Sequence, residues 1–245
     1  QENSFGADYG LSIFNSQCIQ VAKGFYSASR HGVTITGADI VGGVPNREVW
    51  VSQSSIKTSQ NLGAADLHGN SEYCGYTNCT IDGGMVLSGN YTGTFNNFIY
   101  GGQFSNNSPI LLSQVAGLSH TIRGNTIKSS VLPSSRGVFF DLAGNSDAFT
   151  SDTLYGGTFV FDDNVLEHTG ATSSTLPIGL IKNKGYAASE KINISMRGNQ
   201  IRCIDAKLGA LLTVDVDSGK KFTSVAVKGN KVYGAGLLDV QGGGD

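Results

Sequence analysis

One short motif recurs along the chain and limits its fold more than any other feature: a polar turn-forming residue, one variable residue, then isoleucine, leucine or valine. The interval between copies is irregular, from 18 residues between Ile81 and Ile99 to 41 between Ile40 and Ile81. Repeats of this length predict a solenoid, in which each unit stacks on the previous one. The copies are Ala38-Asp39-Ile40, Cys79-Thr80-Ile81, Asn97-Phe98-Ile99, Asn125-Thr126-Ile127, Asn164-Val165-Leu166, Asn199-Gln200-Ile201 and Asn230-Lys231-Val232.

The residues between the motifs favour strands over helices. Apolar residues recur with a period of two, as in Val33 and Ile35 or Val225 and Val227, and no amphipathic helix of three turns is found. Glycine is abundant (34 residues) and proline scarce (4 residues), which suits many tight turns with positive φ. We therefore predict an all-β coil with the recurrent aliphatic side chains stacked inside it.

The recurrent asparagine is predicted to lie at the corners of this coil. Asparagine tolerates the left-handed backbone conformation and bonds neighbouring backbone, and asparagines in register can form a side-chain ladder. Gly-Gly pairs at 42–43, 83–84 and 101–102 predict further tight corners. These residues therefore receive structural roles and no catalytic one.

Charge and hydropathy exclude several classes of function. The formal net charge is −2 without any run of lysine or arginine, so we expect no nucleic-acid partner. No apolar stretch approaches the roughly 18 residues of a membrane-spanning helix, so we expect no membrane insertion. Cys18, Cys74, Cys79 and Cys203 lack metal-binding spacing and are predicted to be free, mostly buried thiols. We predict neither a metal nor a cofactor.

The segment from Arg30 to Glu72 is rich in ionisable side chains, although only 15% of the chain is charged. It contains two of the four histidines, His31 and His68, and the only tryptophan, Trp50. The interval from Asp39 to Cys79 is predicted to hold a long loop, and loops on a rigid scaffold often carry function. We therefore place the candidate site here.

Two parts of this segment, Ser29-Arg30-His31-Gly32 and Gly63-Ala64-Ala65-Asp66-Leu67-His68-Gly69-Asn70, resemble bacteriophage tailspike proteins with a pectate-lyase-like, right-handed parallel β-helix. Tyr9-Gly10-Leu11-Ser12-Ile13-Phe14 is similar to a coil from the middle of such a β-helix. We therefore predict a single-stranded parallel β-helix over residues 1–245 as one domain. We expect upstream coils and a virion-binding head to be missing from it.

The resemblance also implies partners and a location. It implies a homotrimer, a bacterial surface polysaccharide as ligand and, often, glycosidic cleavage by acidic residues. Other virion tail or baseplate proteins are the expected protein partners. The expected location is the virion, as a tail fibre or tailspike assembled in the bacterial host cytoplasm.

Asp66, Glu72 and Glu48 are the candidate catalytic acids. Hydrolysis of a glycosidic bond generally needs two carboxyl groups, one to protonate the leaving oxygen and one to activate water or attack directly. Asp66 with Glu72 or Glu48 would form this pair. Gly69-Asn70 predicts a turn between Asp66 and Glu72, so their even spacing does not place them on one face. The structural alternative for Asp66 is a carboxylate that caps a turn.

His31 and His68 are the candidate catalytic histidines, because imidazole can act as a base, orient a carboxylate or bond sugar hydroxyls. Alternation along a strand would put Asp66 and His68 on one face. The structural alternative for His31 is a buried side chain whose polar atoms are satisfied by Arg30 or Asp66.

Arg30, Arg47, Trp50 and Tyr73 are the candidate substrate-binding residues. Aromatic rings offer a flat apolar face to a sugar ring, and arginine stabilises negative charge. The structural alternative is a surface ion pair between Arg47 and Glu48, with Trp50 packing the predicted loop.

A second acidic group flanks the motif at Asn164. If one strand ran through it, alternation would place Asp163 and Glu167 on the same face. We expect surface roles for this group, which comprises Asp162, Asp163, Glu167 and His168.

Three functional hypotheses follow. The leading one is a phage tailspike depolymerase that hydrolyses a capsule, O-antigen or exopolysaccharide. The second is β-elimination from a uronic-acid polymer, with Arg30 neutralising the substrate carboxylate and His31 abstracting the proton. The third is a receptor-binding adhesin without enzymatic activity.

Overall fold

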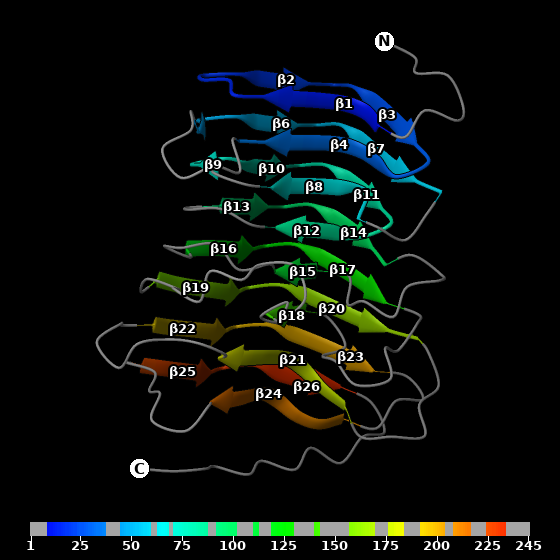
Figure 1. The fold of residues 1–245 in the computed structure, drawn as a ribbon. Coiled ribbons are helices and arrows are strands. Elements are labelled where there is room, and N and C mark those ends of the chain that lie inside the picture. Colours follow the sequence, from blue (N-terminus) through cyan, green and yellow to red (C-terminus); the bar gives the residue numbers. More distant parts are fainter. Residues whose placement is uncertain are drawn as a thin grey trace.

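The computed structural model describes residues 9–37, 45–59, 63–68, 71–87, 92–101, 110–112, 119–129, 140–142, 157–169, 176–183, 192–203, 208–216 and 224–233. Within these ranges every regular element is a β-strand, and the strands form coils stacked from the N-terminal to the C-terminal end (Figure 1). All paired strands are parallel, as in the register of β1 with β4 or of β23 with β26. The predicted parallel β-helix is therefore confirmed. None of the described residues forms a helix that could cross a membrane.

Three long sheets, each with eight strands among the described residues, form the faces of the coil. Sheet A contains β1 (Tyr9–Phe14), β4 (His31–Thr36), β8 (Ala65–His68), β12 (Met85–Leu87), β15 (Ile110–Leu112), β18 (Phe140–Leu142), β21 (Leu176–Asn183) and β24 (Leu208–Val216). Sheet C contains β2 (Gln20–Ala22), β6 (Trp50–Ser52), β10 (Gly75–Thr77), β13 (Thr92–Phe95), β16 (Ser119–Arg123), β19 (Gly157–Asp162), β22 (Ile192–Arg197) and β25 (Ser224–Lys228). Sheet D contains β3 (Phe25–Ala28), β7 (Ser55–Thr58), β11 (Thr80–Asp82), β14 (Phe98–Tyr100), β17 (Thr126–Ser129), β20 (Val165–His168), β23 (Gln200–Cys203) and β26 (Lys231–Tyr233). A short sheet B pairs β5 (Asn46–Arg47) with β9 (Ser71–Glu72).

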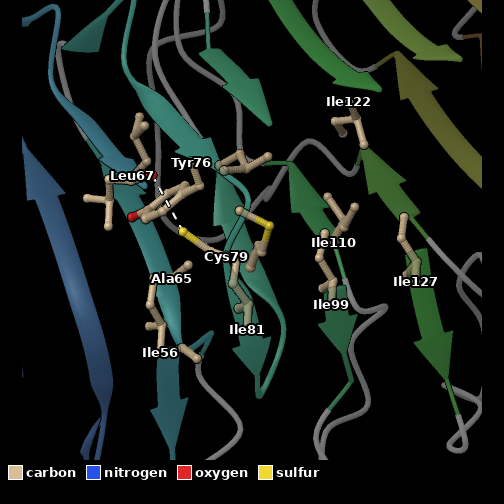
Figure 2. Close-up of a cluster of buried hydrophobic side chains, with 14 of the residues drawn as sticks. Ile56, Ala65, Leu67, Tyr76, Cys79, Ile81, Ile99, Ile110, Ile122 and Ile127 are labelled. Atoms are coloured by element: carbon tan, nitrogen blue, oxygen red, sulfur yellow. Dashed lines mark hydrogen bonds between the residues drawn. The ribbon is translucent and has the colours of Figure 1, made fainter. Parts of the chain in front are cut away.

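The aliphatic residue of the repeated motif forms a stack inside the coil, as predicted. Figure 2 shows Ile56, Ile81, Ile99 and Ile127, which occupy equivalent positions on β7, β11, β14 and β17. All four are fully buried, and burying such a side chain contributes about 1.5–3 kcal/mol. One prediction was wrong: the neighbour of Ile81 toward the N-terminus is Ile56, whereas Ile40 lies outside the described residues.

The predicted asparagine ladder runs along the corner between sheets C and D. Each side-chain oxygen accepts a hydrogen bond from the backbone N–H of the asparagine one coil earlier, at 2.9–3.0 Å where Asn125, Asn164, Asn199 and Asn230 are the acceptors. Each of these oxygens also accepts from the side-chain amide of the previous asparagine. The ladder satisfies backbone groups that the sharp corner leaves outside the sheets.

The corner's left-handed residue is not the ladder asparagine, as we had predicted, but the residue before it. Asp163 has φ +56° and Gly198 has φ +65°, and each precedes a ladder asparagine. The side chain at the left-handed position faces outward, while the asparagine turns its amide inward to the backbone. Glycine, asparagine and aspartate, which tolerate this conformation best, fill the position beside the ladder: Asn96, Gly124, Asp163, Gly198 and Gly229.

The segment from Arg30 to Glu72 is not one loop-bearing excursion. It contains six strands, β4 to β9, and so makes more than one circuit of the coil. Arg47 lies in β5 and Trp50 begins β6, which corrects their predicted place in a loop. Because the segment crosses every sheet, its charged residues are distributed over different faces of the helix.

The described cysteine side chains are free thiols, as predicted. Cys74 and Cys79 are buried and Cys18 is exposed. Burial raises the pKa of the Cys74 and Cys79 thiols, so both remain protonated core residues at neutral pH. The side chain of Cys203 lies outside the described part of the structure.

Candidate functional site

His31 and Asp66 are brought together on sheet A. They lie on adjacent strands, β4 and β8, where Thr34 is in register with Asp66. Ala65 and Leu67 belong to the buried core, so alternation directs the Asp66 side chain outward. His31 and Asp66 are nevertheless only 4% and 1% exposed. Their closest side-chain atoms, His31 Nε2 and Asp66 Oδ2, are 3.7 Å apart.

The partner of the other ring nitrogen fixes the tautomer of His31. Its Nδ1 lies 2.7 Å from the carbonyl oxygen of Gly63. A carbonyl only accepts hydrogen bonds, so Nδ1 carries a proton in both the neutral and the charged imidazole. The Nε2 atom that faces Asp66 is therefore the nitrogen that gains or loses a proton. A buried carboxyl group beside it gives the pair the composition of a proton-transfer site.

Tyr9 and Arg30 extend this pair toward the solvent. The Tyr9 ring is 42% exposed, and its centroid is 5.7 Å from that of the His31 ring. Arg30 Cζ lies 5.8 Å from the Tyr9 ring centroid, within range of a cation–π contact. From inside the coil, the Tyr76 hydroxyl donates to the Asp66 carbonyl at 3.1 Å and holds that backbone in place. Sequence reasoning did not single out Tyr9, because nothing in its local pattern links it to His31.

Glu72 pairs with Arg47 on sheet B. Arg47 Nε and Nη2 donate to Glu72 Oε2 at 2.9 and 2.6 Å, across the adjacent strands β5 and β9. The ion pair that we had considered between Arg47 and Glu48 is therefore wrong, because the parallel register brings a residue of the next coil closer. The Arg47 and Glu72 side chains are 48% and 25% exposed.

Glu48 and Tyr73 occupy a corner of the coil and share an unusual backbone conformation. Both have left-handed φ, +57° for Glu48 and +56° for Tyr73, immediately before sheet C begins. The Cys18 thiol donates to Glu48 Oε2 at 3.5 Å, and this hydrogen bond to a carboxylate raises the pKa of Cys18. Tyr73 is 51% exposed.

Trp50 lies apart from the acidic residues, on the outer face of sheet C. Its neighbour Val51 is fully buried, so alternation turns the indole outward. The centroids of the Trp50 and Phe95 rings are 6.1 Å apart. Phe95 was missed by sequence reasoning. The only signal was the pair of glycines, Gly75 and Gly93, that align with Trp50 on the two following strands.

The predicted site residues therefore form three groups. His31 and Asp66 lie on sheet A with Arg30 nearby, Arg47 and Glu72 on sheet B beside Glu48 and Tyr73, and Trp50 on sheet C. The structure describes the backbone of His68 at the end of β8 but not its side chain. Its predicted role stays a prediction.

The acidic residues of the second group, which flanks Asn164, form ion pairs and hydrogen bonds with other coils. A left-handed corner at Asp163 separates β19 from β20, so the uninterrupted strand that would align Asp163 with Glu167 does not exist. Asp163 pairs with Arg123 at 2.9 Å and Glu167 with Lys128 at 3.4 Å. Asp162 accepts hydrogen bonds from the Ser195 hydroxyl and the Arg197 backbone. These contacts join successive coils.

Metal ligands do not gather anywhere in the described ranges: no three His, Cys, Asp or Glu side chains lie close enough there to hold an ion.

Residues 2–148, more than half of the chain, match the family described as Gp49, pectin lyase-like. The chain belongs to this Gp49 pectin lyase-like family. No curated protein matches it significantly.

Two solved structures have the same fold, which confirms the resemblance to phage tailspikes. The tailspike protein gp49 of Pseudomonas phage LKA1 aligns with a TM-score of 0.68 and 23% identity, over 95% of this chain and 44% of that protein. The tailspike gp61 of Pseudomonas phage phi297 also aligns with a TM-score of 0.68 and 23% identity, over 92% of this chain and 36% of that protein. The family member described here thus spans less than half of either tailspike.

Proposed function

We propose that this protein is part of a phage tailspike that binds and cleaves a bacterial surface polysaccharide. The observation that carries the proposal is the contact between His31 and Asp66. An imidazole with a fixed tautomer faces a carboxyl group within a rigid β-helix, and both side chains are buried. Family membership and the tailspike-like fold support a glycan as the substrate.

The leading mechanism is glycosidic hydrolysis. Asp66 would supply one carboxyl group and Glu72 or Glu48 the other, with His31 and His68 as proton-transfer or orienting groups. Arg30, Arg47, Trp50 and Tyr73 would hold the sugar. In this mechanism Glu72 would act in one of two ways. It would either release Arg47 first, or act while its Oε2 still accepts hydrogen bonds from Arg47.

The second candidate mechanism is β-elimination, and the surroundings of His31 favour it specifically. His31 Nε2 would take the proton α to a uronic carboxylate, while Arg30 would neutralise that carboxylate. The bond from the β-carbon to the glycosidic oxygen would break as the carbon–carbon double bond forms, and the His31 imidazolium would return its proton to the leaving oxygen. Asp66 would stabilise the imidazolium that forms. This mechanism needs only residues that lie together around His31. The third hypothesis, an adhesin that binds without cleaving, predicts that neither product forms.

The experiment is incubation of the protein with capsular, O-antigen and exopolysaccharide preparations. New reducing ends without ultraviolet absorbance indicate hydrolysis, and reducing ends with an absorbing unsaturated product indicate elimination. Asp66→Asn and His31→Gln should each lower the rate by about a hundredfold or more. Asp82→Asn is the matched control, because Asp82 is an exposed carboxylate on sheet D that pairs with Lys57. Full activity in both site variants would refute the proposed site.

The proposal includes a homotrimer within the virion, assembled in the host cytoplasm and joined to other tail or baseplate proteins. The outer face of sheet D supports self-association. Phe25, Phe98 and Val165 share one row across β3, β14 and β20 and are 62%, 52% and 44% exposed. Ser55, Thr80 and Thr126 fill the positions between them, so the row offers separate apolar contacts to a second copy and not a continuous apolar patch. Sedimentation analysis should give a trimer, and Phe98→Glu should give monomers.

A further inference from the structure

The outer face of sheet C carries a pair of aromatic rings and a row of cations that the His31–Asp66 pair does not explain. One row of outward positions contains Phe95 on β13 and Arg123 on β16, in register. The same face carries Arg197 on β22 in register with Lys228 on β25. Because strands lie about 4.8 Å apart, the six spacings from β6 to β25 extend about 29 Å along the helix axis. An extended polymer could therefore contact both features.

The two rings lie against bare backbone. A Cβ atom on Gly75 would approach Trp50 Cζ3 to 3.0 Å, and one on Gly93 would approach Phe95 Cε2 to 2.5 Å. At Gly75 the Cβ would also lie 1.8 Å from the Gly93 carbonyl oxygen, so the neighbouring backbone excludes a larger residue there wherever the ring lies. At Gly93 the nearest atoms belong to the Phe95 and Trp50 rings, so only the rings exclude a larger residue. The rings are tilted by 32° to one another, and both are partly exposed. Together they present a shallow aromatic surface that suits the apolar face of a pyranose ring.

Glycine inside a strand is unfavourable by roughly 0.5–1 kcal/mol relative to alanine, and often marks a close approach by a ligand or another backbone. An aromatic ring that lies over a strand glycine can also have a purely structural role, because it restores the packing that the missing side chain would have provided. The two explanations differ in what they require of the exposed ring faces. Only ligand binding requires those faces to be contacted by another molecule.

The cations supply the second observation. Arg197 and Lys228 are both exposed, and like charges directly opposite one another on neighbouring strands repel. Neither has a carboxylate partner in the parts of the chain that the structure describes. Asp162 is directed elsewhere, to Ser195 and to the Arg197 backbone N–H. A bound anion would relieve this repulsion.

We propose that the outer face of sheet C binds an acidic polysaccharide lying along the helix axis. Trp50 and Phe95 stack against a sugar ring, and Arg197 and Lys228 bind its carboxylate groups. This names the substrate class and rests on the proposed function. The surface is separate from the His31–Asp66 pair, so it holds the polymer and takes no part in bond cleavage.

Intrinsic fluorescence reports on this surface directly, because Trp50 is the only tryptophan in the chain. The intact protein is titrated with polymannuronate, polygalacturonate and polysialate, and with each polymer after reduction of its carboxyl groups. At least one acidic polymer should change the Trp50 emission in a saturable and salt-sensitive manner, whereas its reduced form should not. If no acidic polymer changes the emission, or if the reduced forms do so equally, the proposal is wrong.

Matched variants assign the binding to this face. Phe95→Ala should weaken binding about tenfold, and Lys228→Glu about fivefold at low salt. Phe14→Ala and Lys23→Glu make the same changes at exposed positions outside sheets C and D and should leave the affinity unchanged. Equal losses of affinity in both sets of variants would overturn the assignment to sheet C. Sedimentation showing that Phe95→Ala and Lys228→Glu weaken binding by dissociating copies of the chain would also overturn it.

Cleavage assays separate this proposal from the proposed function. Phe95→Ala and Lys228→Glu should raise KM for the polymer without changing kcat, and Asp66→Asn should abolish cleavage without changing the fluorescence titration. Cleavage of a polymer with unchanged KM in both sheet C variants would refute the binding surface alone. Binding at sheet C with no cleavage of any polymer would refute the depolymerase alone.

Discussion

Replacing Asn164 by alanine is expected to cost a large part of the stability of the β-helix. The side chain is fully buried in the asparagine ladder. Its oxygen accepts from the backbone N–H and the side-chain amide of Asn125 at 3.0 and 3.2 Å. Its amide donates to the Ile122 carbonyl and to the Asn199 side-chain oxygen, both at 3.0 Å. The substitution therefore removes four buried hydrogen bonds.

At about 1 kcal/mol for each net hydrogen bond, the loss is about 4 kcal/mol. The Asn125 N–H and the Ile122 carbonyl lose these partners, which adds to the cost unless water enters the corner. Domains are commonly stable by only 5–15 kcal/mol, so the effect should be visible as a lower denaturation midpoint.

Guanidinium denaturation followed by circular dichroism measures the loss. Asn230→Ala is the matched comparison, because Asn230 is only partly buried and its side chain makes three hydrogen bonds. It should lose less stability than Asn164→Ala. Gln20→Ala, at an exposed strand position of sheet C, should lose about 1 kcal/mol or less. A loss below 1 kcal/mol for Asn164→Ala would show that the ladder is not a major source of stability.

The remaining predictions concern a buried imidazole and the corner glycines. His120 is fully buried, neither ring nitrogen has a hydrogen-bond partner among the residues that the structure describes, and burial lowers its pKa from 6.5 to about 3. The unfolded chain therefore binds a proton that the folded chain does not between pH 6.5 and 3, so stability falls on acidification by up to about 1.4 kcal/mol per pH unit. Unfolding free energies between pH 4 and 7 should show this extra slope in the wild type and not in His120→Phe; equal slopes would contradict it. Gly198→Ala should cost about 1–2 kcal/mol, because φ is +65° and the new Cβ would lie 2.5 Å from Asp163 Oδ1. Gly124→Ala, at φ +69° beside Asn96, is the second case, and calorimetry that finds both variants as stable as the wild type would exclude backbone strain at this corner.

The repeat predicted the fold because it records interactions between neighbouring coils. Asn125, Asn164 and Asn199 recur since each must bond the next, and Ile99 and Ile127 recur since each packs on the next. Such requirements act at every coil, so they remain visible although the intervals vary. The left-handed corner was displaced by one residue in the prediction, because asparagine suits both the ladder and the αL position.

The candidate site could be predicted only in part. The sequence placed ionisable residues between Arg30 and Glu72, but it could not show which sheet each would occupy, because the strands in that segment are as short as two residues. Arg47 therefore pairs with Glu72 rather than with its neighbour Glu48.

The amino-acid sequence alone determined that this protein coils into stacked β-strands with a polar corner and an aliphatic interior, since those features repeat within the chain. Only the tertiary structure decided that His31 meets Asp66, that Phe95 joins Trp50 and that Arg197 faces Lys228. Each of these pairs joins residues of different coils, and loops of varying length set which residues become neighbours. Their contacts depend on the register between strands, which no local pattern contains.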